Sequence, residues 1–226
     1  PIACTSRTAS LKRIRREIGD RNWTAISLSN IGVVLFEEDR LQEAAKYYQE
    51  SLAIAREVGD KRQQVRALHN LAVVSREAGR LVEARAEYEE SLATRAEIGD
   101  KRGMAIGKVE LGAVLLAQGE LERARQVEDE ATQLARETKL TPGEAQAAYQ
   151  LGEIAIARGD LAAGRTHHER GLALRLEMNE TRTVLESRLA LAELALEEGK
   201  PADAERGARQ VDQALGSEPS GPLRVQ

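Results

Sequence analysis

Polar side chains that could hold a peptide recur along this chain at a spacing of 40 residues. One row of this kind contains Asn30, Asn70, Glu110 and Gln150, and ends at Ala190. An amide side chain can bond both the N–H and the C=O of an extended peptide, so the row could grip a peptide backbone. The alternative is that Asn30 and Asn70 only bond a neighbouring helix. Either interpretation requires a fold that places the row on one face.

Two further rows at the same spacing are predicted to lie beside the first. One row contains Ser29, His69, Val109, Tyr149 and Leu189, and the other contains Val33, Val73, Ala113, Glu153 and Glu193. Acidic residues gather toward the C-terminal copies, whereas arginines lie in the second copy. The acidic residues suit a basic partner segment or simply form a solvated surface. We therefore expect the partner-binding residues to be Asn30, Asn70, His69, Glu110, Tyr149, Gln150, Glu153 and Arg66.

Residues for catalysis or metal binding do not form a recognisable pattern. His167 and His168 are adjacent, so on a helix they point about 100° apart, and no second His or Cys pair lies at the i+3 or i+4 spacing. His168 falls on an inward-facing stripe and is expected to be packed. No glycine-rich turn ends in Lys-Ser or Lys-Thr. We expect no catalytic residues, no metal, no cofactor and no enzymatic activity.

The 40-residue period also predicts the elements that position these rows. In the copy at residues 61–100, Leu68, Leu71 and Ala72 mark one stripe of a first helix, which Gly79 ends. A second helix follows and ends at Gly99, and Asp100 is placed to cap the next first helix. We call the two helices of each copy helix A and helix B. A fixed period of this length indicates stacked copies of one small unit.

Departures from the repeat are interpreted as substitutions that keep its geometry. Asn179 stands where the pattern expects glycine, and Asn also tolerates the left-handed conformation. Thr141 and Glu144 are predicted to form a capping box around Pro142. A small residue follows a large aliphatic one in each helix A, and we expect it to let two helix backbones approach closely. These small residues are Gly32, Ala72, Gly112, Gly152 and Ala192.

Composition excludes several classes of protein. The 226 residues are 42% apolar and only 3% aromatic, which favours helices over strands. With 33 basic and 37 acidic side chains the net charge is −4, so there is no basic excess for nucleic acid. No apolar run approaches the roughly 18 residues that a membrane span needs. The lone cysteine, Cys4, suits a reducing cytoplasm.

The repeating residues resemble the tetratricopeptide repeat (TPR). Its pattern of Leu-Gly in helix A and Gly before helix B appears here as Leu111-Gly112 and Gly119, and Ala44 with Tyr48 completes it in the first copy. The longer 40-residue form is similar to that of kinesin light chains, Pins-type adaptors and large bacterial signalling regulators. The resemblance implies an all-α, right-handed superhelical solenoid of antiparallel helix pairs, with about five repeats plus an N-terminal half-repeat. The family's carboxylate clamp is not reproduced, since Ser29, Val33 and Ile106 occupy its positions.

The chain is accordingly divided into three parts. Residues 1–20 resemble a helix B without its helix A and are interpreted as a truncated or capping unit, because the run from Arg16 to Asp20 parallels that from Arg56 to Asp60. Residues 21–215 form the five-repeat solenoid, and residues 216–226 are expected to be a flexible tail.

Two functions remain open at this point. The first is a protein–protein interaction scaffold in the cytoplasm, whose concave groove holds a peptide or helix of a protein partner. The second is an effector-sensing regulatory module of a larger bacterial signalling or transcription-regulating NTPase, in which the groove takes a small effector or another domain of the same protein. Neither function involves nucleic acid or a membrane.

Overall fold

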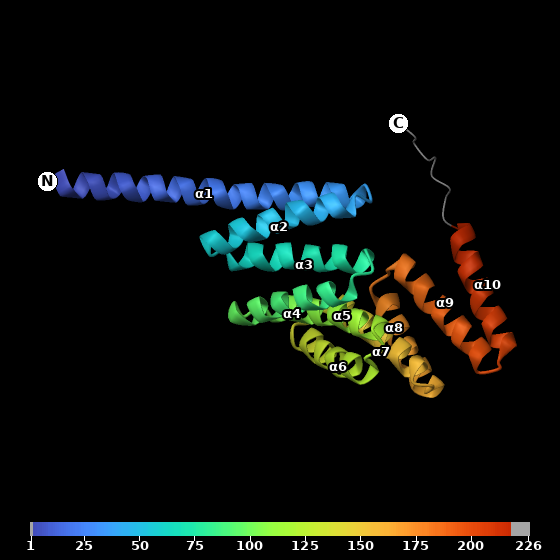
Figure 1. Cartoon of the computed structure of the whole chain (residues 1–226). Coiled ribbons are helices and arrows are strands. Elements are labelled where there is room, and N and C mark those ends of the chain that lie inside the picture. Colours follow the sequence, from blue (N-terminus) through green and yellow to red (C-terminus); the bar gives the residue numbers. More distant parts are fainter. Residues whose placement is uncertain (1, 218–226) are drawn as a thin grey trace. The chain divides into compact units, whose positions relative to one another are not determined.

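Helices account for almost all of the described chain. The computed structural model describes residues 2–217, and in this range there are ten α-helices and no β-strand. The helices are α1 (Ile2–Glu37), α2 (Leu41–Val58), α3 (Lys61–Glu77), α4 (Leu81–Glu97), α5 (Lys101–Ala117), α6 (Leu121–Glu137), α7 (Thr141–Ala157), α8 (Leu161–Glu177), α9 (Thr181–Glu197) and α10 (Pro201–Ser217) (Figure 1). The odd-numbered helices carry the helix-A sequences and the even-numbered ones carry the helix-B sequences. The all-α prediction is confirmed.

The chain divides into two compact units, which are described separately. Unit 1 spans Pro1–Gln118 and contains α1 to α5; unit 2 spans Gly119–Gln226 and contains α6 to α10. Within each unit, every helix packs against the helix that follows it in sequence. Each unit is therefore a stack of antiparallel helices joined by short turns, as the 40-residue period predicts.

The turns depend on residues in the left-handed conformation. Six glycines have φ between 70° and 81°, and the non-glycine residues Asp39, Lys139 and Asn179 have φ of 59°, 53° and 56° at the equivalent places. The prediction for Asn179 is confirmed. The predicted cap is also present, because the Asp100 carboxylate accepts a hydrogen bond from the Gly103 N–H at 2.9 Å.

Two local features differ from what the sequence pattern indicates. The run from Arg16 to Asp20 parallels that from Arg56 to Asp60, but no helix ends at Gly19, because α1 runs without a break from Ile2 to Glu37. Glycine permits a left-handed turn but does not impose one. The sequence Gly-Asp therefore forms a turn at residues 59–60 but is part of a helix at residues 19–20. The capping box is also absent. The N-cap residue of α7 is Leu140, and the Glu144 carboxylate instead accepts hydrogen bonds from Arg136 (3.0 Å) and Arg170 (2.9 Å).

The three-part division of the chain is not decided by these helices. That residues 1–20 are a partial repeat stays a prediction, although they belong to one helix with the first helix A. Of the tail predicted for residues 216–226, α10 includes the first two residues, and the others lie outside the described part of the chain.

Two of the small residues of helix A, Gly32 and Gly152, make room for a ring and not for a backbone. A Cβ atom on Gly32 would lie 2.5 Å from Cε1 of the Tyr48 ring, and one on Gly152 would lie 2.7 Å from Cε1 of His168. Both rings are almost fully buried, which confirms the packed position expected for His168. Close backbone approach occurs instead at Gly171 in helix B, where a Cβ would lie 3.2 Å from the Ala145 carbonyl oxygen.

A buried polar network joins the first three helices of unit 1. The Gln63 amide donates to Ser29 Oγ (2.8 Å) and to Ser51 Oγ (2.9 Å), and Ser51 Oγ donates to the Ala25 carbonyl at 2.7 Å. Both serines are fully buried, so their hydroxyl groups depend on these partners. The network fixes α1, α2 and α3 against one another.

Candidate partner-binding site

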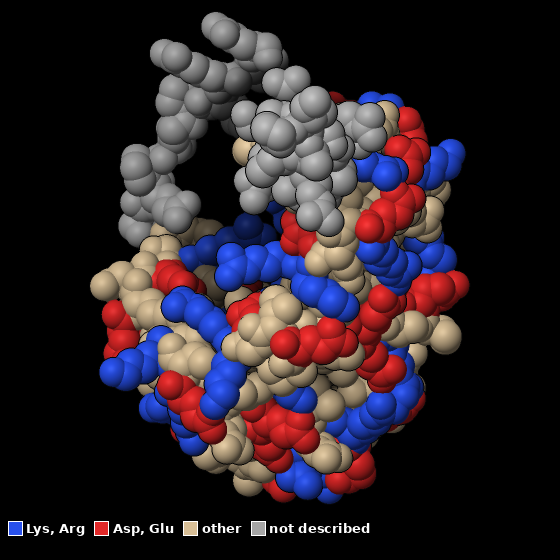
Figure 2. Space-filling view, turned by 90° about the vertical axis from the view of Figure 1, so that its left-hand side faces the viewer, with Lys and Arg blue, Asp and Glu red and all other residues tan. Residues whose placement is uncertain are grey.

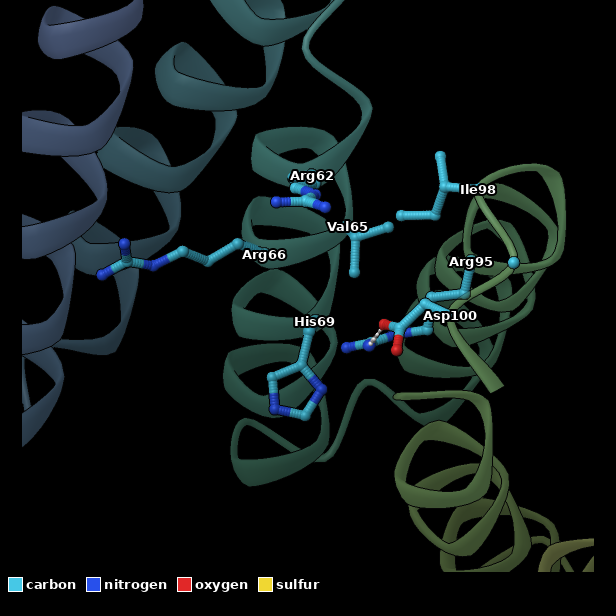
Figure 3. A pocket seen from close by; sticks show the side chains of 8 residues that line it. Arg62, Val65, Arg66, His69, Arg95, Ile98 and Asp100 are labelled. Carbon is cyan, nitrogen blue, oxygen red and sulfur yellow. Dashed lines mark hydrogen bonds and ion pairs between the residues drawn. The ribbon is translucent and has the colours of Figure 1, made fainter. Parts of the chain in front are cut away.

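A pocket of about 570 Å³ opens in unit 1 between α3, the end of α4 and the start of α5 (Figure 3). We call it the arginine pocket; it is lined by Arg62, Val65, Arg66, His69, Arg95, Ile98, Gly99 and Asp100. Two of the predicted site residues, Arg66 and His69, are among them. The pocket therefore lies on the side of α3 that the sequence assigns to partner binding.

Positive charge dominates the arginine pocket. Arg62 and Arg66 lie one turn apart on α3, and both are exposed. Within the described residues Arg62 has no hydrogen bond or ion pair, and Arg66 donates to the neutral side-chain oxygen of Asn30 at 2.7 Å. Arg95 donates from Nη1 to Oδ2 of Asp100 at 2.6 Å. Three arginines thus line the pocket with a single carboxylate, which Arg95 already pairs with, while the Arg66 guanidinium is turned toward Asn30 on α1 (Figure 3). This excess of basic side chains suits an anion.

Gly103 allows Arg95 to reach this position. A Cβ on Gly103 would overlap with Nη1 of Arg95 and with the carboxylate of Asp100. Asp100 has two tasks, since one oxygen caps α5 and the other accepts from Arg95. The same turn therefore starts a helix and orients a pocket arginine.

His69 is a neutral member of the arginine pocket near pH 7. Its ring lies edge-on to Tyr88, with centroids 5.9 Å apart, and burial lowers the pKa of its imidazole. A neutral imidazole can offer one donor and one acceptor to a ligand. Glu110, by contrast, is already engaged, because its carboxylate accepts from Arg76 (3.1 Å) and from the Tyr88 hydroxyl (3.3 Å).

The two asparagines of the predicted clamp differ in their surroundings. Asn30 is exposed and accepts the hydrogen bond from Arg66, so it bonds a neighbouring helix, which was the alternative interpretation. Asn70 is half-buried and forms no hydrogen bond within the described residues. Asn70 is thus the amide that remains available to a ligand.

The other predicted residues belong to unit 2. The Tyr149 ring lies 5.0 Å from the His168 ring, and the Arg175 guanidinium lies 4.9 Å from the centroid of Tyr149. Glu153 has a carboxylate oxygen 3.1 Å from Nε2 of His168. Gln150 is only 8% exposed. The eight predicted residues therefore form two groups, one in each unit.

Two important residues were missing from the sequence prediction. Arg62 lies four residues before Arg66, so helical spacing alone could have placed it on the same face. Arg95 comes from helix B and occupies a position that is Ala55 and Ala135 in other copies. The sequence feature that could have indicated Arg95 is the glycine at position 103, which has no side chain to block it. That feature can be interpreted only when it is known that the two helices pack together.

Other kinds of site have little support in the described part of the chain. No group of three or more His, Cys, Asp or Glu side chains in residues that the structure describes could hold a metal ion. None of the described helices combines the length and hydropathy of a membrane span. On the face drawn in Figure 2, acidic and basic side chains are interspersed, which agrees with the small net charge of −4.

Helix pairs at a 40-residue period, with a pocket beside helix A, define an α-helical repeat protein. A family model described as tetratricopeptide repeat matches residues 3–57 and 63–137, and a second model with that description matches residues 145–170 and 185–210. The chain belongs to the tetratricopeptide repeat family. No curated protein sequence matched it.

Solved structures show the same fold at low sequence identity. BtubC (BKLC) from P. vanneervenii has a TM-score of 0.77 and 21% identity, covering 98% of this chain and 94% of that one. The kinesin light chain TPR-like repeats from Podosopora anserina have a TM-score of 0.70 and 18% identity, over 84% and 93% of the two chains. A Rap protein complexed with Competence and Sporulation Factor has a TM-score of 0.75 and 16% identity. That match covers 85% of this chain but 54% of the Rap chain.

Proposed function

We propose that unit 1 binds an extended, acidic segment of a protein partner, and that the chain acts by binding and not by catalysis. The observation that carries this proposal is the arginine pocket, in which Arg62, Arg66 and Arg95 outnumber the single carboxylate of Asp100. A protein or peptide ligand is further supported by the similarity to a Rap protein complexed with Competence and Sporulation Factor.

The pocket residues divide the recognition between charge and hydrogen bonding. The guanidinium groups of Arg62 and Arg66 bind a partner's carboxylates through paired N–H donors, which fixes their orientation as well as their charge. Asn70 bonds the peptide backbone, and neutral His69 supplies one further donor or acceptor. Val65 and Ile98 give the pocket an apolar wall for the aliphatic part of a Glu side chain.

The test compares two labelled peptides of equal length, one rich in Glu and one rich in Lys, by fluorescence anisotropy. We expect the Glu peptide to bind, and its affinity to fall with added salt because exposed charges are screened. Replacing both exposed arginines, R62Q with R66Q, should weaken binding about tenfold, since this corresponds to about 1.4 kcal/mol for two partly exposed charged contacts.

A matched control removes the same charge elsewhere in unit 1. Arg80 and Arg85 do not line the arginine pocket, so R80Q with R85Q should change the affinity by less than about twofold. Equal loss in both double variants would mean that net charge alone attracts the peptide. Equal affinity for the Glu and Lys peptides would refute the proposal.

The amide contribution is tested separately. N70A with N30A should weaken binding of the Glu peptide while leaving the thermal midpoint near that of the parent chain, because neither side chain is fully buried. Unchanged affinity in this double variant would remove the backbone clamp from the proposal but leave the arginine pocket.

A second candidate function is a regulatory module in a larger signalling protein. It is favoured by the similarity to the Rap protein, of which this chain matches about half the length. In this case the arginine pocket takes an acidic segment from another domain of the same protein. Binding of the Glu peptide by the isolated chain, but not by the full-length protein, would distinguish this function from a scaffold.

A further inference from the structure

The last helix pair of unit 2 lacks a ring that other pairs contain. Tyr48, Tyr88 and His168 occupy one helix-B position at multiples of 40 residues, and each is 2% exposed or less. In α10 the equivalent residue is Ala208. The helix-A residue that faces this position is also small in α9, where it is Ala192. Gly207 lies against Ala192, since a Cβ on Gly207 would be 2.9 Å from the Ala192 Cβ, whereas Ala208 is exposed and has no ring to cover the surface beside it.

An open apolar pocket of about 330 Å³ marks this space. We call it the α9–α10 slot; it is lined by Leu189, Ala192, Glu193, Leu196, Pro201, Ala204, Glu205 and Ala208. Leu189 and Leu196 remain 47% and 60% exposed at its edge. Apart from two glutamates the lining is entirely apolar, so the slot suits an uncharged side chain.

Other pairs in this chain show which side chain fits such a slot. Leu189 corresponds to His69 and Tyr149, and both of those residues contact the helix-B ring of their own pair. The centroid distances are 5.9 Å for His69 with Tyr88 and 5.0 Å for Tyr149 with His168. The helix-A residue at this position therefore packs against a helix-B ring in two other pairs.

The charges around the slot select what lies beside that ring. Glu193 is exposed and has no ion pair within the described residues. Glu205 is exposed as well and pairs only with Arg209 of its own helix. Burial is the main cause that raises the pKa of Tyr149; Glu153, Glu186 and Glu193 raise it further, and Arg175 lowers it. The two charged residues that line the slot itself, Glu193 and Glu205, are both acidic.

We propose that the α9–α10 slot receives an aromatic side chain of a protein partner, flanked by Lys or Arg residues that face Glu193 and Glu205. The partner's ring takes the place that Tyr48 and Tyr88 take in the earlier pairs. The site is distinct from the arginine pocket and does not depend on the function proposed for it. Ring burial supplies the affinity, and the glutamates select basic neighbours.

The experiment uses three labelled peptides of seven residues and the complete chain. The first has the sequence Gly-Lys-Lys-Trp-Lys-Lys-Gly, the second has Ala in place of Trp, and the third has Glu in place of each Lys. We expect the first peptide to bind at least tenfold more tightly than either of the others in fluorescence anisotropy. Equal affinities for the Trp and Ala peptides would overturn the proposal.

A variant of the chain closes the slot with the chain's own ring. A208Y should fill the space as Tyr88 does opposite Ala72, remove the preference for Trp and keep or raise the thermal midpoint. The matched control is Q213Y, which adds the same side chain at an exposed position of α10 and should leave the preference unchanged. A folded A208Y variant that still prefers the Trp peptide would refute the slot as its binding site.

Two further measurements separate the partner's ring from other occupants. E193Q with E205Q should lower the affinity for the Lys-containing Trp peptide at least threefold. An unchanged affinity would refute the role of the glutamates. Sedimentation should give the mass of a single chain. A doubled mass that A208Y abolishes would assign the slot to a second copy of the chain and overturn the proposal.

Discussion

Gly103 offers the sharpest test of how packing builds the arginine pocket. In G103A the new Cβ would overlap with Nη1 of Arg95 and with the carboxylate of Asp100. The end of an arginine side chain is flexible and can move away, so the main cost is the loss of its ion pair. Asp100 must also rotate, which weakens its cap on the Gly103 N–H.

The expected loss of stability follows from the contacts that break. The side chains of Arg95 and Asp100 are 14% and 36% exposed, so their charge-assisted hydrogen bond contributes about 1–2 kcal/mol after allowance for solvent. The cap contributes about 1 kcal/mol. Replacing Gly by Ala in a helix returns up to about 1 kcal/mol. We expect the free energy of unfolding of G103A to be about 1–2 kcal/mol lower than that of the parent chain.

G107A is the matched control, because it gives the same substitution in the same helix. A Cβ on Gly107 would lie 3.0 Å from one methyl group of Leu92, which can shift, and breaks no polar contact. In urea unfolding followed by circular dichroism, the free energy of unfolding of G103A should be about 2 kcal/mol lower than that of G107A, provided the m values agree. The gap should narrow in 1 M salt, where the screening length is about 3 Å. Equal stability of the two variants would refute the reasoning.

Three further predictions concern burial, pH and small residues. Arg175 is 2% exposed and donates to Gln146, Ser187 and the Thr183 carbonyl; R175A should cost about 3–5 kcal/mol in urea unfolding because it leaves a cavity and three polar groups without their donor, whereas R175M should cost less because its side chain refills most of the cavity. Burial lowers the pKa of His69, so the unfolded chain takes up a proton before the folded one and stability falls as pH drops below about 6.5; H69N should flatten the dependence of the thermal midpoint on pH between about 7.5 and 5.5, and an unchanged slope would contradict this. G32A should cost about 1–3 kcal/mol because of the Tyr48 ring, whereas G19A, with no atom within 4 Å of its Cβ, should increase helicity in circular dichroism.

Elements that depend on local chemistry were predictable from the sequence. A glycine or asparagine every 40 residues marked the helix ends at Gly59, Gly99 and Asn179, and Asp100 identified a cap. These signals act within a few residues, so one copy of the repeat was sufficient to read them. The helix pairs and the all-α class followed from them.

Features that depend on neighbours were harder to predict. Gly19 has a local sequence similar to that of Gly59 but forms no turn. Glu144 does not cap its own helix, because its carboxylate accepts hydrogen bonds from Arg136 and Arg170. Arg95 reaches the arginine pocket only because Gly103 on the next helix leaves space. Each of these outcomes requires knowing which helix lies beside which, and a 40-residue period does not encode that detail.

The buried hydroxyl and amide groups of α1, α2 and α3 imply that the copies are not interchangeable. Gln63 has its two closest acceptors in Ser29 and Ser51, while the residues 40 and 80 positions later are Gly103 and Gly143. If the second copy were moved one place along, Ser91 would stand in for Ser51, but His69 would replace Ser29 beside the amide. A duplicated second copy would therefore keep only part of the buried network, at a cost in free energy that an entirely apolar array would not have.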